Sequence, residues 1–322
     1  MKMKLAYLTA LLLAASASVA QAGTSLDLSR YQLVGNHALD TLGELGLEAS
    51  AVTYARDRNS LFFVGDEGLG VVEISTTGQT LGSMAFNWDG TGSSHNDSEG
   101  LTYLGNGQLV VVDERPQIAY SFTYSNGGSV TLNTQPKVAI TGSTASVGNA
   151  GTEGISYDPA TGKFYSVKQD NPVQVRESTL NFAVGFGTAT TTTLYSGTSS
   201  VLGLNSLSDI QTLSPVDALA GTAAEDNLLL LSLDSEVLVE LDPTSGTILS
   251  SFDLSGVTNQ AIEGVTIDHL GNIYLVAEDS GTPNSRLFVL SAPVPEPETY
   301  ALMLAGLGLV GFAARRRQPE KP

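Results

Sequence analysis

The sequence predicts an all-β fold, specifically a β-propeller of five blades with four antiparallel strands each around a central channel. A short phrase, an acidic residue followed by a small residue and a strand-like run, recurs along the chain, and no amphipathic helix separates the copies. The acids are spaced 51, 54, 56 and 54 residues apart, the length of one propeller blade. They are Glu48, Glu99, Glu153, Asp209 and Glu263. A propeller repeats each position around one axis, so these carboxylates should converge on the channel.

Within each copy, further strand-like runs follow turns rich in Gly, Asn and Asp. The second runs are 61–64, 108–112, 164–167, 228–233 and 272–276, and third runs include 70–74, 117–122 and 286–290. Five copies between about residue 28 and residue 291 favour five blades. Six would require a hidden blade in the low-complexity region 182–204. We expect residues 29–34 to complete the last blade and so remove a free sheet edge.

The N-terminus has the form of a secretory signal peptide. Lys2 and Lys4 precede an apolar run at 5–15, and a small-residue cleavage site ends at Ala22. The apolar run is short for a membrane anchor, which is the weaker alternative. The predicted organisation is therefore a signal peptide at 1–22, a propeller at 23–293 and a tail at 294–322.

The C-terminal tail reads as a short membrane-spanning helix that is stopped by cations on the cytoplasmic side. Its parts are Pro295, Glu296 and Pro297, the uncharged stretch 300–314, and Arg315, Arg316 and Arg317. In this order they resemble the PEP-CTERM sorting signal. The resemblance implies processing by an exosortase and a place at the cell surface or in the extracellular matrix of a gram-negative bacterium that makes exopolysaccharide. An ordinary tail anchor is the alternative.

Composition excludes several kinds of site. The chain has no cysteine, so disulfides, iron–sulfur clusters and thiol catalysis are excluded. With 33 acids against 15 bases the net charge is −18, which argues against nucleic acid or an anionic membrane surface as a partner. An acidic surface favours divalent cations or simple solubility.

The five repeated acids are the first candidate site. Carboxylates gathered in one channel repel each other and are costly to desolvate, and a cation with oxygen ligands relieves both penalties. A loose cage suits Ca²⁺ better than Mg²⁺. In the alternative, each acid caps backbone N–H groups or pairs with a neighbouring blade. The fourth copy departs from the pattern, which makes Asp209 the doubtful member.

A second set of acids follows the second strands. For these we favour contacts between blades, with Arg115 as a partner, over a rim of metal ligands around the same pore. The set comprises Asp66, Glu67, Asp113, Glu114, Asp170 and Glu278. The oxygen-rich loop 87–97 holds the one tryptophan but lacks the spacing of an EF-hand. No nucleophile elbow is present, and the three histidines, His37, His95 and His269, are scattered.

Several of these segments together resemble the SdiA-regulated, YjiK-like propeller family from about residue 40 to residue 291. They are 48–50 with 63–68, 97–115, 153–157, 229–234 with 240–242, and 263–268 with 271–276. The Asp-x-Glu-Gly to Asp-Glu-Arg blade, 97–115, is the most specific of them. The resemblance implies a propeller of five or six blades with calcium as a ligand, and implies little about activity.

Two functions remain open. The first is a calcium-stabilised binding module that recognises exopolysaccharide or other envelope proteins. The second is a metal-dependent hydrolase, of lactonase or phosphoesterase type, with the metal in the channel. Acids that recur almost uniformly suit architecture and binding better than catalysis, so we favour the first.

Overall fold

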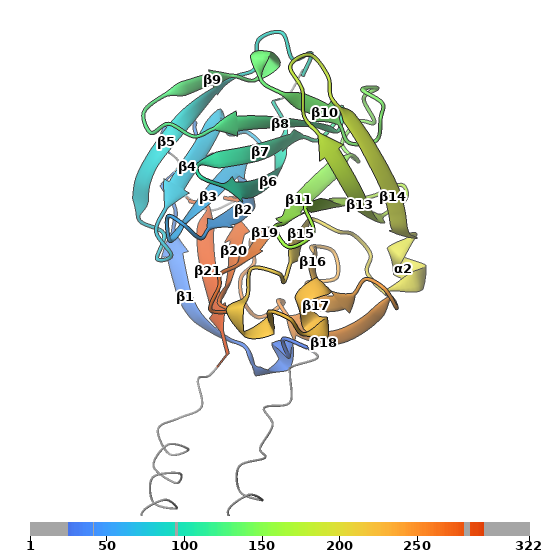
Figure 1. Cartoon of the computed structure of the whole chain (residues 1–322). Coiled ribbons are helices and arrows are strands. Elements are labelled where there is room, and N and C mark those ends of the chain that lie inside the picture. The colour runs from blue at the N-terminus through green and yellow to red at the C-terminus, as the bar shows by residue number, and fades with distance from the viewer. Residues whose placement is uncertain (1–24, 41, 94–95, 280–283, 293–322) are drawn as a thin grey trace, which may run out of the picture.

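Five antiparallel sheets surround a common axis in the computed structural model, which describes residues 25–40, 42–93, 96–279 and 284–292. Figure 1 shows the innermost strand of every sheet gathered near the centre. These are β2 (Ala49–Ala55), β6 (Ser98–Gly105), β11 (Thr152–Asp158), β15 (Asp209–Thr212) and β19 (Ile262–Ile267). Each of them contacts its two neighbours, so the ring is closed. The five-blade prediction is confirmed.

The remaining strands continue each blade outward. Blade 1 adds β3 (Ser60–Gly65), β4 (Gly70–Ile74), β5 (Thr80–Asn87) and, parallel to β5, β9 (Ser129–Thr131). Blade 2 adds β7 (Gln108–Asp113), β8 (Ile118–Thr123) and β10 (Lys137–Ala139). Blade 3 adds β12 (Lys163–Lys168), β13 (Gln174–Asn181) and β14 (Thr188–Ser196). Blade 4 adds β16 (Leu228–Ser232), β17 (Val237–Asp242) and β18 (Thr247–Asp253).

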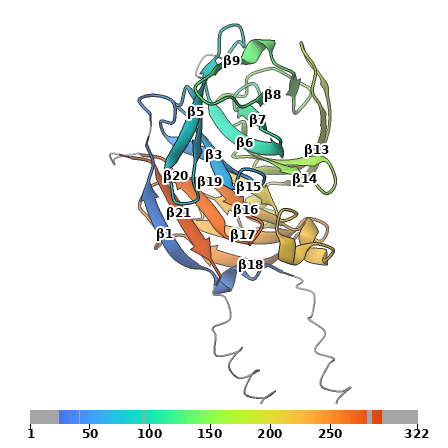
Figure 2. The ribbon, with the colours of Figure 1, turned by 60° about the vertical axis from the view of Figure 1, so that its left-hand side comes forward.

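Blade 5 joins the two ends of the propeller. Its strands beyond β19 are β20 (Ile273–Ala277), β21 (Arg286–Ser291) and β1 (Gln32–Ala38). The N-terminal β1 pairs antiparallel with the last strand, β21, and Figure 2 shows the four strands of this blade in that order. The expected closing strand is confirmed, although it runs a few residues later than predicted.

Helices are few and short among the described residues. They are η1 (Leu28–Arg30), η2 (Leu132–Thr134), α2 (Thr198–Val201), η3 (Asp217–Leu219) and η4 (Ala223–Asp226). Within that part of the chain, no helix is long and apolar enough to cross a membrane. The predicted signal peptide at 1–22 and tail at 294–322 lie outside the described residues.

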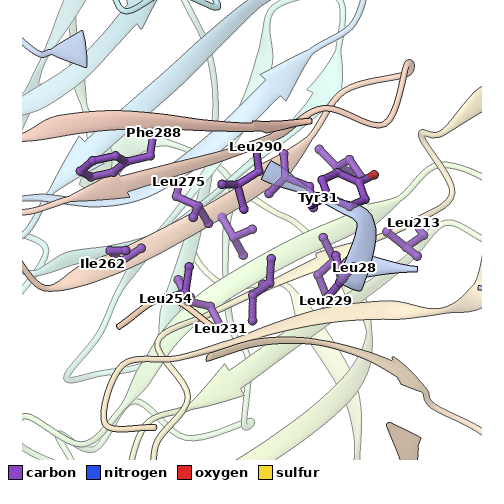
Figure 3. Close-up of a cluster of buried hydrophobic side chains, with 14 of the residues drawn as sticks. Leu28, Tyr31, Leu213, Leu229, Leu231, Leu254, Ile262, Leu275, Phe288 and Leu290 are labelled. Carbon is purple, nitrogen blue, oxygen red and sulfur yellow. The ribbon is translucent and has the colours of Figure 1, made fainter. Parts of the chain in front are cut away.

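The core lies between the blades rather than in one central mass. On β16, Leu228 and Leu230 pack toward blade 3, whereas Leu229 and Leu231 pack against blade 5. Figure 3 shows the second contact, where Leu229 and Leu231 lie in one cluster with Leu275 and Phe288. Side chains alternate along a strand, so a strand with both faces covered reads as a continuous apolar run.

Neighbouring innermost strands lie so close together that only glycine fits at the position after the bulge residue. A Cβ on Gly264 would lie 2.8 Å from the backbone oxygen of Ser50, and one on Gly154 would lie 2.3 Å from Asp209 Oδ1. Both distances are too short for a real contact, which explains why glycine follows the acid in these copies.

Side-chain hydroxyls join neighbouring inner strands. The backbone N–H of Tyr103 donates to Thr53 Oγ1 at 3.1 Å, and that of Tyr157 donates to Thr102 Oγ1 at 2.9 Å. Thr212 N–H bonds Ser156 Oγ and Tyr54 N–H bonds Thr266 Oγ1, each at 3.1 Å. At the fifth position Gln211 Oε1 accepts a bond from Thr266 Oγ1 at 3.0 Å. We call Thr53, Thr102, Ser156, Gln211 and Thr266 the hydroxyl ring, in which Gln211 contributes an amide, and its four hydroxyls satisfy backbone donors that no strand can pair.

Removing one hydroxyl should therefore weaken the ring measurably. Thr102→Val keeps the shape of the side chain but removes the acceptor of the partly buried Tyr157 N–H, which should cost about 0.5–1.5 kcal/mol of unfolding free energy. Thr102→Ser retains the oxygen and is the matched control. Urea unfolding of both variants checks this, and equal stability losses would contradict the role of the hydroxyl.

Candidate functional site

Four of the five inner strands carry a β-bulge near their first residues. The strand register shifts between Ala49 and Ala51, and at the corresponding places in β6, β11 and β19. The residues at these bulges are Ser50, Glu99, Glu153 and Glu263. A bulge re-aims one side chain relative to the regular pleat. No register shift occurs in β15.

The positions of the bulges show which residues of the repeated copies correspond, and for the first copy they differ from the alignment predicted from the sequence. Ser50, not Glu48, occupies the position of Glu99, because Tyr54 and Tyr103 each lie four residues beyond their bulge and donate to equivalent hydroxyls. The Glu48 carbonyl instead accepts a bond from Asp66 N–H, as the Asp97 carbonyl does from Glu114 N–H. Glu48 therefore corresponds to Asp97. The alignment was wrong by two residues because both phrases contain an acid and small residues.

The closest group of carboxylates lies where blades 1 and 2 meet. Asp66 follows β3, Asp97 precedes β6 and Glu99 lies on the β6 bulge, and one carboxylate oxygen from each lies within 4.8 Å of the others. Asp97 was not among the predicted ligands, although its place two residues before Glu99 was a usable signal. Arg115 donates from Nε to Asp97 Oδ2 and from a second nitrogen to Asn149 Oδ1 at 2.8 Å.

A second close pair lies where blades 2 and 3 meet. Glu114 is 1% exposed, and its Oε1 accepts a bond from Gly151 N–H at 2.7 Å. Its Oε2 is buried with no hydrogen-bond partner among the described residues. The Glu153 carboxyl lies within hydrogen-bonding distance of the Glu114 carboxyl. Two carboxylates cannot bond to each other, so this hydrogen bond forms only when one of the two keeps its proton.

These carboxyls act on one another electrostatically. Burial, reinforced by the nearby Asp97, raises the pKa of Asp66 to about 8. Burial, with repulsion from Glu278, likewise raises the pKa of Glu263 to about 8. The pKa values of Glu99 and Glu153 are raised well above normal, first by burial and then by neighbouring acids. We call this group the acidic mouth, namely Asp66, Asp97, Glu99, Glu114, Glu153 and Glu263.

Asp209 lies apart from the acidic mouth. It is 2% exposed, and its two oxygens accept bonds from Ile210 N–H at 2.8 Å and Val265 N–H at 2.7 Å. The second bond joins blade 4 to blade 5. Burial raises the pKa of this carboxyl. Asp209 thus satisfies backbone donors between blades, the architectural alternative for the repeated acids.

The other predicted acids have mixed surroundings. Glu67 and Asp170 are exposed, and Asn171 donates to both oxygens of Asp170. Asp113 is buried beside Ser93, and burial raises its pKa to about 7. Glu278 lies near enough to Glu263 to raise its pKa.

The described histidines lie away from the acidic mouth. His37 is on the outer strand β1. His269 Nδ1 lies 2.9 Å from the Tyr54 hydroxyl, beyond the far end of the inner strands. His95 lies outside the described residues.

Comparisons with solved structures show likeness of fold. The chain is 12% identical to glutaminyl cyclase from Myxococcus xanthus, with a TM-score of 0.51 over 83% of this chain and 97% of that chain. For a luciferin-regenerating enzyme the identity is 10%, the TM-score 0.48, and the coverage 81% and 95%. For the β-propeller domain of Cps50 (Swd1) from Myceliophteria thermophila the identity is 12% and the TM-score 0.39, over 77% of this chain and 66% of that chain.

Comparisons with family models are more specific. The model of the PEP-CTERM protein-sorting motif matches residues 293–317, which indicates export through the exosortase pathway to the envelope or surface of a gram-negative cell. The model described as SdiA-regulated matches residues 25–288, nearly the whole propeller. This chain belongs to the SdiA-regulated family.

Proposed function

We propose that this chain is a non-catalytic binding module outside the cytoplasm, stabilised by one divalent cation in the acidic mouth, and that calcium is that cation. The single observation that carries the cation proposal is the convergence of Asp66, Asp97 and Glu99, with oxygens within 4.8 Å of one another. The sorting motif supports the location.

Electrostatics supports a cation at this position. Several acids in one partly buried mouth must either keep protons or bind a positive charge. Arg115 supplies one positive charge to Asp97, and the raised pKa values of Asp66 and Glu263 show that repulsion and desolvation remain. A divalent ion would compensate both at neutral pH.

The donor set supports calcium in particular. The available ligand atoms are carboxylate oxygens. Ca²⁺ is coordinated by six to eight oxygens in a flexible geometry, whereas Mg²⁺ requires near-ideal octahedral coordination at shorter distances. Glu114 and Glu153 are near enough to act electrostatically on Glu99 and add further carboxylate oxygens around this position. Extracellular calcium modules bind with dissociation constants of about 10⁻⁴ to 10⁻³ M, which suits an exported protein.

Binding is a better proposal than catalysis for this site. A metal-dependent hydrolase would need mixed ligands and a positioned general base near the open face. Within the described part of the chain, the mouth combines carboxylates with one guanidinium, and His37 and His269 lie elsewhere. The structural likeness to a glutaminyl cyclase concerns the fold alone.

Calcium should raise the melting temperature of the purified protein relative to EDTA. At a concentration one hundred times the dissociation constant the stabilisation is about 2.7 kcal/mol, or roughly 5–10 °C for a chain of this size. Mg²⁺ should have a smaller effect. Glu99→Gln and Asp66→Asn should lose the calcium response while raising the melting temperature in EDTA, because each removes a repelling charge.

The neighbouring exposed acid provides the matched control for this experiment. Glu67→Gln removes the same charge one residue from Asp66, but Glu67 is exposed and should leave the calcium response intact. Differential scanning calorimetry measures all four proteins. A calcium response absent from the wild type, or equal in all variants, would overturn the cation proposal.

The cation-free protein should lose stability as pH rises. The pKa values of Asp66 and Glu263 rise from 3.8 and 4.5 to about 8 in the folded state, so between those limits the native protein binds more protons than the unfolded chain. Linkage then requires that the unfolding free energy from these groups falls from about pH 4.5 to pH 8.

Urea unfolding in EDTA between pH 5 and pH 8 tests this dependence. Glu263→Gln should show a shallower decline than the wild type, because the variant has one fewer titrating group. Added calcium should also reduce the decline by replacing protons. Identical pH slopes for wild type and Glu263→Gln in EDTA would contradict the assignment.

A further inference from the structure

A cavity of about 520 Å³ opens at the other end of the inner strands. Its lining comes from all five blades and includes the hydroxyl ring together with Tyr54, Tyr103, Tyr157 and Ile267, the residues that immediately follow it in four of the five inner strands. The volume lies within the range of about 300–1,000 Å³ typical of small-molecule sites. This cavity is separate from the acidic mouth, whose bulge residues precede the hydroxyl ring by three positions.

The floor of the cavity offers hydroxyl groups. Four of the five members of the hydroxyl ring use a side-chain oxygen to accept a backbone N–H. Thr266 donates its hydroxyl proton to Gln211 and Ser156 donates its own to Thr212 Oγ1 at 3.5 Å. The Thr53 and Thr102 hydroxyls accept in the same way and, among the described residues, still have a proton to donate to a ligand. Ser214 also lines the cavity, and its Oγ has no hydrogen-bond partner among the described residues.

Three tyrosines, Tyr54, Tyr103 and Tyr157, are among the lining residues, and other contacts hold their rings in place. The Tyr103 ring stacks on Phe62 with centroids 5.8 Å apart, and the Tyr157 ring lies 5.0 Å from that of Phe164. The Tyr103 hydroxyl also accepts a bond from Gly107 N–H at 2.7 Å. Rings fixed in this way bind a ligand without a further ordering cost.

The charged groups at the rim already have hydrogen-bond or ion-pair partners. Arg56 pairs with Asp217 at 2.8 Å and donates to the Pro215 carbonyl at 3.3 Å. Asp57 accepts a bond from Asn106 N–H at 3.0 Å. The rim thus carries one cation and two acids, a net charge of −1, while the floor residues are uncharged, so the cavity disfavours anions and admits an uncharged ligand.

We propose that this cavity binds a neutral carbohydrate, at least one pyranose unit of a glycan. A pyranose has apolar C–H faces and a rim of hydroxyls, which match tyrosine walls above a floor of hydroxyl groups. Tyrosine combines an apolar ring with a polar tip, so it contacts both parts of such a ligand. The proposal is independent of the cation in the acidic mouth.

Two hairpin turns of the same design provide a sharp test. In the turn that begins at Asp158, Oδ1 accepts from the N–H two residues later at 2.8 Å and Oδ2 from a hydroxyl at 2.6 Å. The turn that begins at Asp242 repeats both bonds, at 2.8 and 2.7 Å. Pro159 in the first turn lines the cavity, and Pro243 in the second is not among its lining residues.

The experiment titrates the purified protein with cellobiose, maltose and lactose, using saturation-transfer difference NMR in EDTA. Glucose 6-phosphate and galacturonate serve as charged comparison probes. We expect at least one neutral disaccharide to bind and the charged probes to bind more weakly. Pro159→Trp, which obstructs the rim, and Tyr157→Ala, which removes a wall, should each weaken binding about tenfold. Pro243→Trp should leave binding unchanged.

Three results would overturn the proposal. One is the absence of binding for all three neutral probes, and another is binding of the charged probes as tight as that of the neutral ones. The third is neutral-probe binding that neither Pro159→Trp nor Tyr157→Ala weakens. Because every titration contains EDTA, these results stand apart from the outcome of the calcium experiments.

Discussion

The crowding of five inner strands around one axis is the constraint on which the rest of this structure depends. The innermost strand of each blade has an edge that no further strand can pair, and its N–H groups must still find acceptors. Hydroxyls of Thr53, Thr102, Ser156 and Thr266 supply them from the neighbouring strand. Glycine follows the bulge because a Cβ there would collide with the next strand.

The same constraint separates two kinds of chemistry along the channel. At the bulges the side chains leave the regular pleat, and in three blades they are glutamates that gather with Asp66 and Asp97. Three residues later the strands are regular again, and small hydroxylated side chains join them. Acidic charge is thereby concentrated at one end of the inner strands, while the cavity at the other end has an uncharged floor and one cation against two acids at its rim.

Much of the architecture could be predicted because strands and turns repeat at a fixed interval. The five blades and the N-terminal closing strand followed from that interval and from the need to cover a sheet edge. The site was predicted less well. Glu48 was aligned with Glu99 in place of Ser50 because the phrases at 48–50 and 97–100 both contain an acid and small residues, so the sequence does not distinguish the two alignments. Asp97 was overlooked because its role depends on a partner, Asp66, from another blade.

The sequence by itself determined the fold class, the blade number, the acidic character and the sorting motif, since each depends on periodicity, composition or a contiguous pattern. Only the tertiary structure decided which acids meet. It placed Asp66 beside Asp97 and Glu99, put Asp209 on backbone donors of the next blade, and formed a tyrosine-lined cavity from five separate strands. These outcomes depend on angstrom-scale register between neighbouring blades, which the order of residues along the chain does not reveal.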